Sequence, residues 1–117
     1  ILKLDSAFDA TVRRMNNPQS PAYSVRNTVE EMKRFDGHMI LQTMFLRGSC
    51  DGQPVDNTTE EEVSAWVGLV AEIRPRQVMV YSLDRDTPCR TLEKVSKEEL
   101  QRIAARVEAL GIPCSVA

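Results

Sequence analysis

Residues 38–46 read HMILQTMFL, an apolar run interrupted only by His38, Gln42 and Thr43. A short apolar run of this kind is typical of a strand in a parallel sheet, because helices cover both faces of such a sheet. The segments on either side repeat apolar residues at three- and four-residue steps, which indicates amphipathic helices. The run therefore predicts a central strand in a fold of alternating strands and helices.

The same alternation continues through the whole chain of 117 residues. Strands are predicted at 1–5, 38–46, 77–83 and 112–117, and helices at about 7–15, 24–36, 59–74 and 97–110. The remaining long stretches, 47–57 and 84–95, are predicted as polar loops at carboxyl ends of strands. Alternation of this kind, with short connections, favours a parallel sheet with right-handed crossovers. We predict an α/β fold in which parallel β/α repeats form part of a TIM-like (β/α) barrel.

Local signals set the expected helix limits. The second helix places Val25, Val29, Met32 and Phe35 on one face, and Ser24 is its predicted N-cap. The third and fourth helices begin with capping boxes, in which a hydroxyl and a glutamate each satisfy an orphan N–H group; the pairs are Thr59 with Glu62 and Ser96 with Glu99.

The chain opens and closes within predicted strands, and cut strands expose unpaired backbone groups. We therefore expect residues 1–117 to be one segment of a larger protein. A partial barrel also leaves an apolar sheet face uncovered, so we expect the isolated segment to self-associate.

Composition excludes several classes of function. The chain is 42% hydrophobic and 27% charged with a net charge of −2, which fits a folded domain and gives no basic stripe for nucleic acid. No apolar run approaches the roughly 20 residues of a membrane span. Cys50, Cys89 and Cys114 are far apart and match no metal-ligand spacing, so we expect free thiols, no metal ligands and a reducing, cytoplasmic location.

Ligands of parallel α/β folds bind at the carboxyl ends of the strands. Lys3 and Asp5 lie at the first such end and alternate with leucines, so both point to the same face, either toward a ligand or as a solvated ion pair. Gln42 and Thr43 are polar inside an apolar strand and need a partner, which is a ligand or a neighbouring strand. Arg47 follows the same strand. Its guanidinium either forms paired hydrogen bonds with a carboxylate or phosphate, or belongs to a plain turn.

The third strand ends in a second polar group. Tyr81, Asp84 and Arg85 offer hydrogen-bonding side chains there, although an Asp–Arg pair within the loop is an equal alternative. His38 lies at the opposite, amino end of its strand and is interpreted as structural or exposed. The chain contains no phosphate-binding glycine loop, Ser–His–Asp set or HExxH, so we assign no catalytic residue.

Several segments together resemble the middle and carboxyl part of radical S-adenosylmethionine enzymes. The resemblance covers essentially the whole chain and is greatest for a subgroup of iron–sulfur oxidoreductases that includes glycyl-radical activating enzymes, such as the pyruvate formate-lyase activator, and wyosine-type tRNA-modifying enzymes. The segments are ILKLD at 1–5, RMNNP at 14–18, KRF at 33–35, ILQTMFLRG at 40–48, Asp56-Asn57, EEEVSAWVGLVAEIRP at 60–75, VMVYSLDRDTP at 78–88 and VSKEELQRIAARVEALGIPCSV at 95–116.

This resemblance implies the C-terminal half of a radical S-adenosylmethionine partial barrel. In the family, a CxxxCxxC loop binds a [4Fe–4S] cluster that holds S-adenosylmethionine; this chain lacks the motif, so no cofactor is expected on the segment alone and it is expected to be inactive alone. The missing N-terminal half would be its main partner, with a protein substrate left open. By resemblance, the cofactor contacts are Lys3, Asp5, Gln42, Thr43 and Arg47, and the substrate contacts are Tyr81, Asp84 and Arg85.

Two other functions are consistent with the same residues. One is a non-catalytic α/β docking domain that uses an exposed sheet edge. The other is an aldolase-like barrel fragment in which Lys3 forms a Schiff base, although no second lysine or base is evident nearby. A CxxxCxxC motif in the coding sequence upstream of these residues would decide for the radical enzyme.

Overall fold

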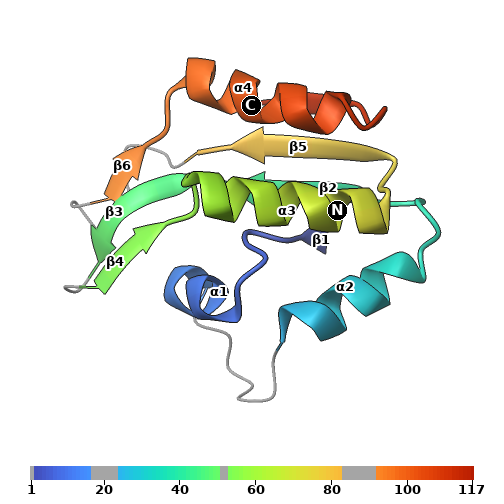
Figure 1. The fold of residues 1–117 in the computed structure, drawn as a ribbon, viewed down its shortest axis with the longest axis horizontal. Helices are drawn as coiled ribbons and strands as arrows, with labels where there is room; N and C mark the ends of the chain where they lie inside the picture. The colour runs from blue at the N-terminus through green and yellow to red at the C-terminus, as the bar shows by residue number, and fades with distance from the viewer. Residues whose placement is uncertain (1, 17–23, 51–52, 83–91) are drawn as a thin grey trace.

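A computed structural model describes residues 2–16, 24–50, 53–82 and 92–117. The strands form a four-stranded sheet and a three-stranded sheet. In Figure 1 the smaller sheet lies beyond the carboxyl ends of the two central strands of the larger sheet, and helices pack along the larger sheet. The strands are β1 (Leu2–Lys3), β2 (Ile40–Met44), β3 (Leu46–Cys50), β4 (Gln53–Asp56), β5 (Gln77–Tyr81), β6 (Leu92–Lys94) and β7 (Cys114–Val116). The helices are α1 (Asp9–Asn16), α2 (Val25–Lys33), α3 (Glu60–Ile73) and α4 (Lys97–Glu108). Within these residues, no helix has the length and apolar character that a bilayer span requires.

The larger sheet has the order β1-β2-β5-β7, and every neighbouring pair is parallel. The predicted strands therefore lie side by side in the order of the sequence. This arrangement confirms the α/β class built from parallel β/α repeats.

One face of this sheet forms the core. Leu41 of β2 and Val78 and Val80 of β5 have no exposed surface, which follows from the two-residue alternation of a strand. All helices of the described chain pack on this face, and their buried residues include Val12, Val29, Trp66 and Leu100. The opposite face is not covered in the same way, so the interpretation of residues 38–46 as a strand covered on both faces is wrong.

The predicted N-caps are confirmed, and the glutamate carboxylates of the two predicted capping boxes bind other parts of the chain. The hydroxyls of Thr59 and Ser96 accept hydrogen bonds from the backbone N–H groups of Glu62 and Glu99, at 3.1 and 3.2 Å. The carboxylate of Glu99 instead binds Arg47. The Glu62 carboxylate accepts hydrogen bonds from Ser6 and Thr11. The first turns of α3 and α4 therefore each bind another part of the chain through a glutamate.

The second helix is shorter than predicted. It begins after Ser24, whose hydroxyl accepts from the backbone N–H of Asn27 at 3.1 Å, but it ends at Lys33. The chain then turns through Asp36 and Gly37, which have positive φ angles of 53° and 83°. Phe35 falls on this turn and is 48% exposed, so its predicted place on the apolar face is wrong.

The predicted polar loop at 47–57 is also wrong, because much of it forms a second sheet. The predicted loop at 84–95 is wrong at residues 92–94, which form β6 of the same sheet. Strands β3 and β4 pair antiparallel, and β6 pairs antiparallel with the other edge of β3. These strands carry mostly polar side chains and therefore lack the apolar pattern from which strands are predicted. Their pairing depends on backbone groups, which every residue carries. The Asp51-Gly52 dipeptide, a common hairpin turn sequence, was the signal that could have predicted the β3–β4 pair.

Asn57 joins the two sheets. Its side chain is buried, with 1% of the residue exposed. The amide oxygen accepts from the backbone N–H of Leu46 at 2.9 Å, and the amide nitrogen donates to the backbone oxygens of Asp5 and Met44, both at 2.8 Å. One side chain thus ties together the end of β1, the end of β2 and the start of β3.

Replacing Asn57 with alanine should destabilise the whole fold. The change leaves three buried backbone groups without their partner, and each unsatisfied group costs about 1–3 kcal/mol. We expect a loss of about 3 kcal/mol in the free energy of unfolding, measured by urea denaturation.

The matched control is Asn27→Ala, which removes the same amide from an exposed position on α2. This control should change stability by less than about 0.5 kcal/mol, as for most surface substitutions. Equal effects of the two substitutions would contradict the role assigned to Asn57.

Candidate functional site

The uncovered face of the parallel sheet carries three of the predicted site residues, Lys3, Gln42 and Tyr81. Its side chains alternate with the core residues, and strand register brings Lys3, Gln42 and Met79 into one row and Met44 and Tyr81 into the next. We call these five residues the open face. Gln42, Met44, Met79 and Tyr81 are partly buried and Lys3 is exposed, so a ligand can reach them.

Lys3 is the charged group of the open face. Its side chain is 46% exposed, and its ammonium lies 3.6 Å from the Asp5 carboxylate and 5.7 Å from the centre of the Tyr81 ring. Partial burial alone would lower the pKa of Lys3, but hydrogen bonding to Tyr81 and the charge of Asp5 outweigh it and hold the pKa above its usual value. Lys3 is therefore a firmly protonated hydrogen-bond donor at neutral pH.

Asp5 lies beside Lys3 but does not reach the surface. Its side chain is 0% exposed, and one carboxylate oxygen accepts the backbone N–H of Met44 at 2.9 Å. The other oxygen faces the Lys3 ammonium. Asp5 thus fixes the end of β1 against the end of β2.

Gln42 and Thr43 point to opposite faces of the sheet. Gln42 lies on the open face between Lys3 and Met79. Thr43 lies on the helix-covered face with no exposed surface, where its hydroxyl donates to the backbone oxygen of Leu4 at 2.6 Å and accepts from the Trp66 indole at 3.0 Å. The predicted role of Thr43 in cofactor binding does not fit this position, because its hydroxyl is enclosed by protein.

Arg47 also lies away from the open face. It belongs to β3 of the smaller sheet, and its guanidinium pairs with the Glu99 carboxylate of α4. The hydrogen bond to Glu99 raises the pKa of Arg47 above its usual value. The structure therefore gives Arg47 a tertiary ion pair, and its cofactor contact stays a prediction.

Tyr81 ends β5 on the open face, while Asp84 and Arg85 lie outside the described residues. Sequence reasoning assigned no specific role to Ser82, the neighbour of Tyr81. Its hydroxyl donates to the backbone oxygen of Phe45 at 2.7 Å and accepts the backbone N–H of Val95 at 2.8 Å. Ser82 thus fixes the carboxyl end of β5, and only its place at a strand end could have indicated this.

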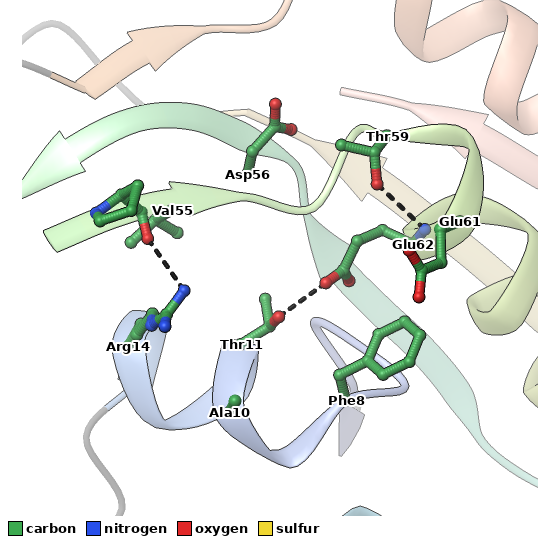
Figure 2. A pocket seen from close by; sticks show the side chains of 10 residues that line it. Phe8, Ala10, Thr11, Arg14, Val55, Asp56, Thr59, Glu61 and Glu62 are labelled. Carbon is green, nitrogen blue, oxygen red and sulfur yellow. Dashed lines mark hydrogen bonds between the residues drawn. The ribbon is translucent and has the colours of Figure 1, made fainter.

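A hollow of about 370 Å³ lies away from the open face, between α1, β4 and the start of α3 (Figure 2). Two hydrogen bonds cross it: Thr11 donates to Glu62 at 2.6 Å, and Arg14 donates to the backbone oxygen of Pro54 at 3.3 Å. These contacts hold α1 against β4 and α3. They give the hollow a structural explanation.

The described residues do not fit an iron–sulfur cluster. No group of three or more His, Cys, Asp or Glu residues is placed to hold a metal in that part of the chain. Cys114 is half-buried in β7, and burial raises the pKa of its thiol to about 12. Cluster ligands are thiolates, so Cys114 is a poor ligand.

Comparison with known proteins gives a likeness of fold. No family model matches the chain, and no curated protein matches it. The structure resembles a radical SAM methyltransferase from Sphaerobacter thermophilus, with a TM-score of 0.70 over 98% of this chain and 18% sequence identity. The likeness is one of fold. The chain spans about a third of the length of that protein, of which 32% is covered.

Proposed function

We propose that this chain is part of a radical S-adenosylmethionine enzyme and supplies cofactor and substrate contacts through the open face. The observation that carries the proposal is the exposed Lys3 ammonium beside Gln42 and Tyr81, on a parallel β/α sheet with the fold of a radical SAM methyltransferase. The segment resemblance described above supports the same family. The enzyme would abstract hydrogen, as in activation of glycyl-radical enzymes.

The side chains of the open face fit the polar groups of S-adenosylmethionine. Lys3 donates to a carboxylate or hydroxyl, the Gln42 amide both donates and accepts, and Tyr81 adds a ring and a hydroxyl. We assign the cofactor contacts to Lys3 and Gln42 and the substrate side to Tyr81. When bound, the sulfonium cofactor supplies the 5′-deoxyadenosyl group for hydrogen abstraction, and these residues bind and orient it.

The cluster must come from elsewhere, since the described residues do not fit it. We assign it to an N-terminal part of the same cytoplasmic enzyme, which would also cover the open face. Both S-adenosylmethionine and a [4Fe–4S] cluster are then cofactors of the whole enzyme.

The aldolase-like alternative loses its main support in this structure. A Schiff-base lysine must attack as the neutral amine, whereas the surroundings of Lys3 raise its pKa. The docking-domain alternative predicts no affinity of the open face for S-adenosylmethionine, so the binding experiment below separates it from our proposal.

Lys3→Met should weaken S-adenosylmethionine binding by roughly tenfold to a hundredfold in the enzyme that contains this segment. The substitution removes a charge-assisted hydrogen bond, worth on the order of 1.5–3 kcal/mol, while keeping a similar side-chain length. Isothermal titration calorimetry measures the affinity. The control is His38→Ala, an exposed position at the amino end of the sheet, which should leave affinity unchanged. Unchanged affinity in Lys3→Met would refute the assignment.

The 117-residue segment by itself should self-associate as a two-fold dimer. Its open face includes Met44, Met79 and Tyr81, and the strands β1 and β7 are each paired on one side in the described sheet. Uncovered apolar surface and unpaired edges both favour association. Sedimentation velocity should show a dimer at micromolar concentration. A monomer throughout that range would count against the idea that another part of the enzyme covers this face.

A further inference from the structure

The turns before β2 and β5, at residues 34–38 and 74–76, form a second surface at the end of the molecule opposite the smaller sheet (Figure 1). The two turns lie against each other, because a side-chain carbon at Gly37 would be only 3.1 Å from the backbone oxygen of Arg74. We call these two turns the amino-end surface. It lies at the amino ends of the strands, whereas ligands of parallel α/β folds bind at the carboxyl ends.

Backbone hydrogen bonds hold both turns in one shape. The N–H of His38 donates to the backbone oxygen of Phe35 at 2.9 Å within the first turn. The N–H of Arg76 donates to the backbone oxygen of Met39 at 3.0 Å, which ties the second turn to the start of β2. A surface that is already ordered loses less conformational entropy when a partner binds to it.

Phe35 is the apolar group of the amino-end surface. With 48% of the residue exposed, it is the one large hydrophobic residue classed as exposed in the described part of the chain. Phe35, Glu31 and Arg34 line a hollow of about 350 Å³, which is large enough for one bulky side chain. Aromatic residues beside such hollows are common anchors of protein–protein interfaces.

The same surface is positively charged, although the whole chain has a net charge of −2. It exposes three arginines, Arg34, Arg74 and Arg76, against one carboxylate, that of Asp36. Within the described ranges no carboxylate forms an ion pair with these arginines, whereas Arg47 is paired. Arg74 donates to a backbone oxygen before β7 at 3.3 Å, which does not neutralise its charge. Guanidinium groups of this kind favour carboxylates as partners.

The carboxylates near the arginines distinguish between classes of anionic partner. Glu31 lines the hollow and Asp36 directly follows Phe35. Both would repel the closely spaced phosphates of a nucleic acid or of an anionic membrane. A protein can instead place its carboxylates against the arginines only, and fill the hollow beside Glu31 with an uncharged side chain.

We propose that the amino-end surface docks an acidic segment of a partner protein. The segment inserts one apolar side chain into the hollow at Phe35 and places aspartate or glutamate side chains against Arg34, Arg74 and Arg76. The inference does not rest on the proposed function, because this surface lies at the opposite end of the strands from Lys3 and Tyr81.

The test uses the enzyme that contains this segment, without S-adenosylmethionine, and a short synthetic peptide in which glutamates flank one fluorinated phenylalanine. Fluorine NMR follows the titration, and we expect saturable binding. Phe35→Ala should weaken the affinity roughly tenfold, because truncation of an interface anchor removes most of its contact area. Arg76→Gln should weaken it roughly threefold and reduce its salt dependence, because an exposed ionic attraction is modest and screened by salt.

The matched control is Arg102→Gln, at an exposed position of α4 that also has no ion pair among the described residues. It should leave the affinity unchanged within about twofold, as for a distant exposed charge. Two unlabelled competitor peptides test the enzyme without any substitution. A peptide with alanine in place of phenylalanine should displace the probe roughly tenfold less well than the parent peptide. A peptide with lysines in place of the glutamates should not displace it.

Absence of saturable binding at millimolar peptide would overturn the proposal. Unchanged affinity in Phe35→Ala, or equal displacement by the alanine peptide, would overturn it as well. Better displacement by a single-stranded oligonucleotide or by anionic lipid vesicles than by the acidic peptide would assign the surface to that class and refute a protein partner. Failure of Lys3→Met to change S-adenosylmethionine binding bears only on the proposed function.

Discussion

The fold depends on a buried amide that joins two sheets of different kinds. A parallel sheet ends where β2 ends, and two residues later the same chain runs in an antiparallel sheet. Such a change of partner would leave backbone groups of both sheets without hydrogen bonds in a dry interior. Asn57 meets this constraint, because its side chain offers an acceptor and two donors, and all three are used by Leu46, Asp5 and Met44.

The other buried polar groups lie around the same junction. Asp5 accepts the Met44 N–H on the open side of the sheet, while Thr43 and Trp66 share the Leu4 oxygen on the helix side. Burial of polar groups costs free energy unless every group is paired, so this cluster is stable as a complete set and fragile when one member is lost. Its rigidity also fixes Lys3, since Asp5 belongs to the junction and its carboxylate lies 3.6 Å from the Lys3 ammonium.

Much of this architecture is predictable from the sequence, and the exceptions share a cause. Apolar periodicity gave the four parallel strands and the helices, because burial selects side chains at fixed steps. It missed the strands β3, β4 and β6, whose pairing is made by backbone groups and whose side chains are mostly polar. For the site, alternation correctly placed Lys3 and Asp5 on one face. It could not show that Asp5 is enclosed, that Thr43 faces the helices or that Arg47 meets Glu99, because these depend on which elements pack together.

The central claim is that the polar junction is as stable as the core. Amide hydrogen exchange of the Leu46 N–H, which bonds to Asn57, measures this most directly, with the Val78 N–H in the middle of the parallel sheet as reference. The account predicts that both amides exchange only by global unfolding, with equal protection and equal dependence on denaturant. Rapid exchange of Leu46 while Val78 stays protected would show that the junction opens on its own, and would contradict the account.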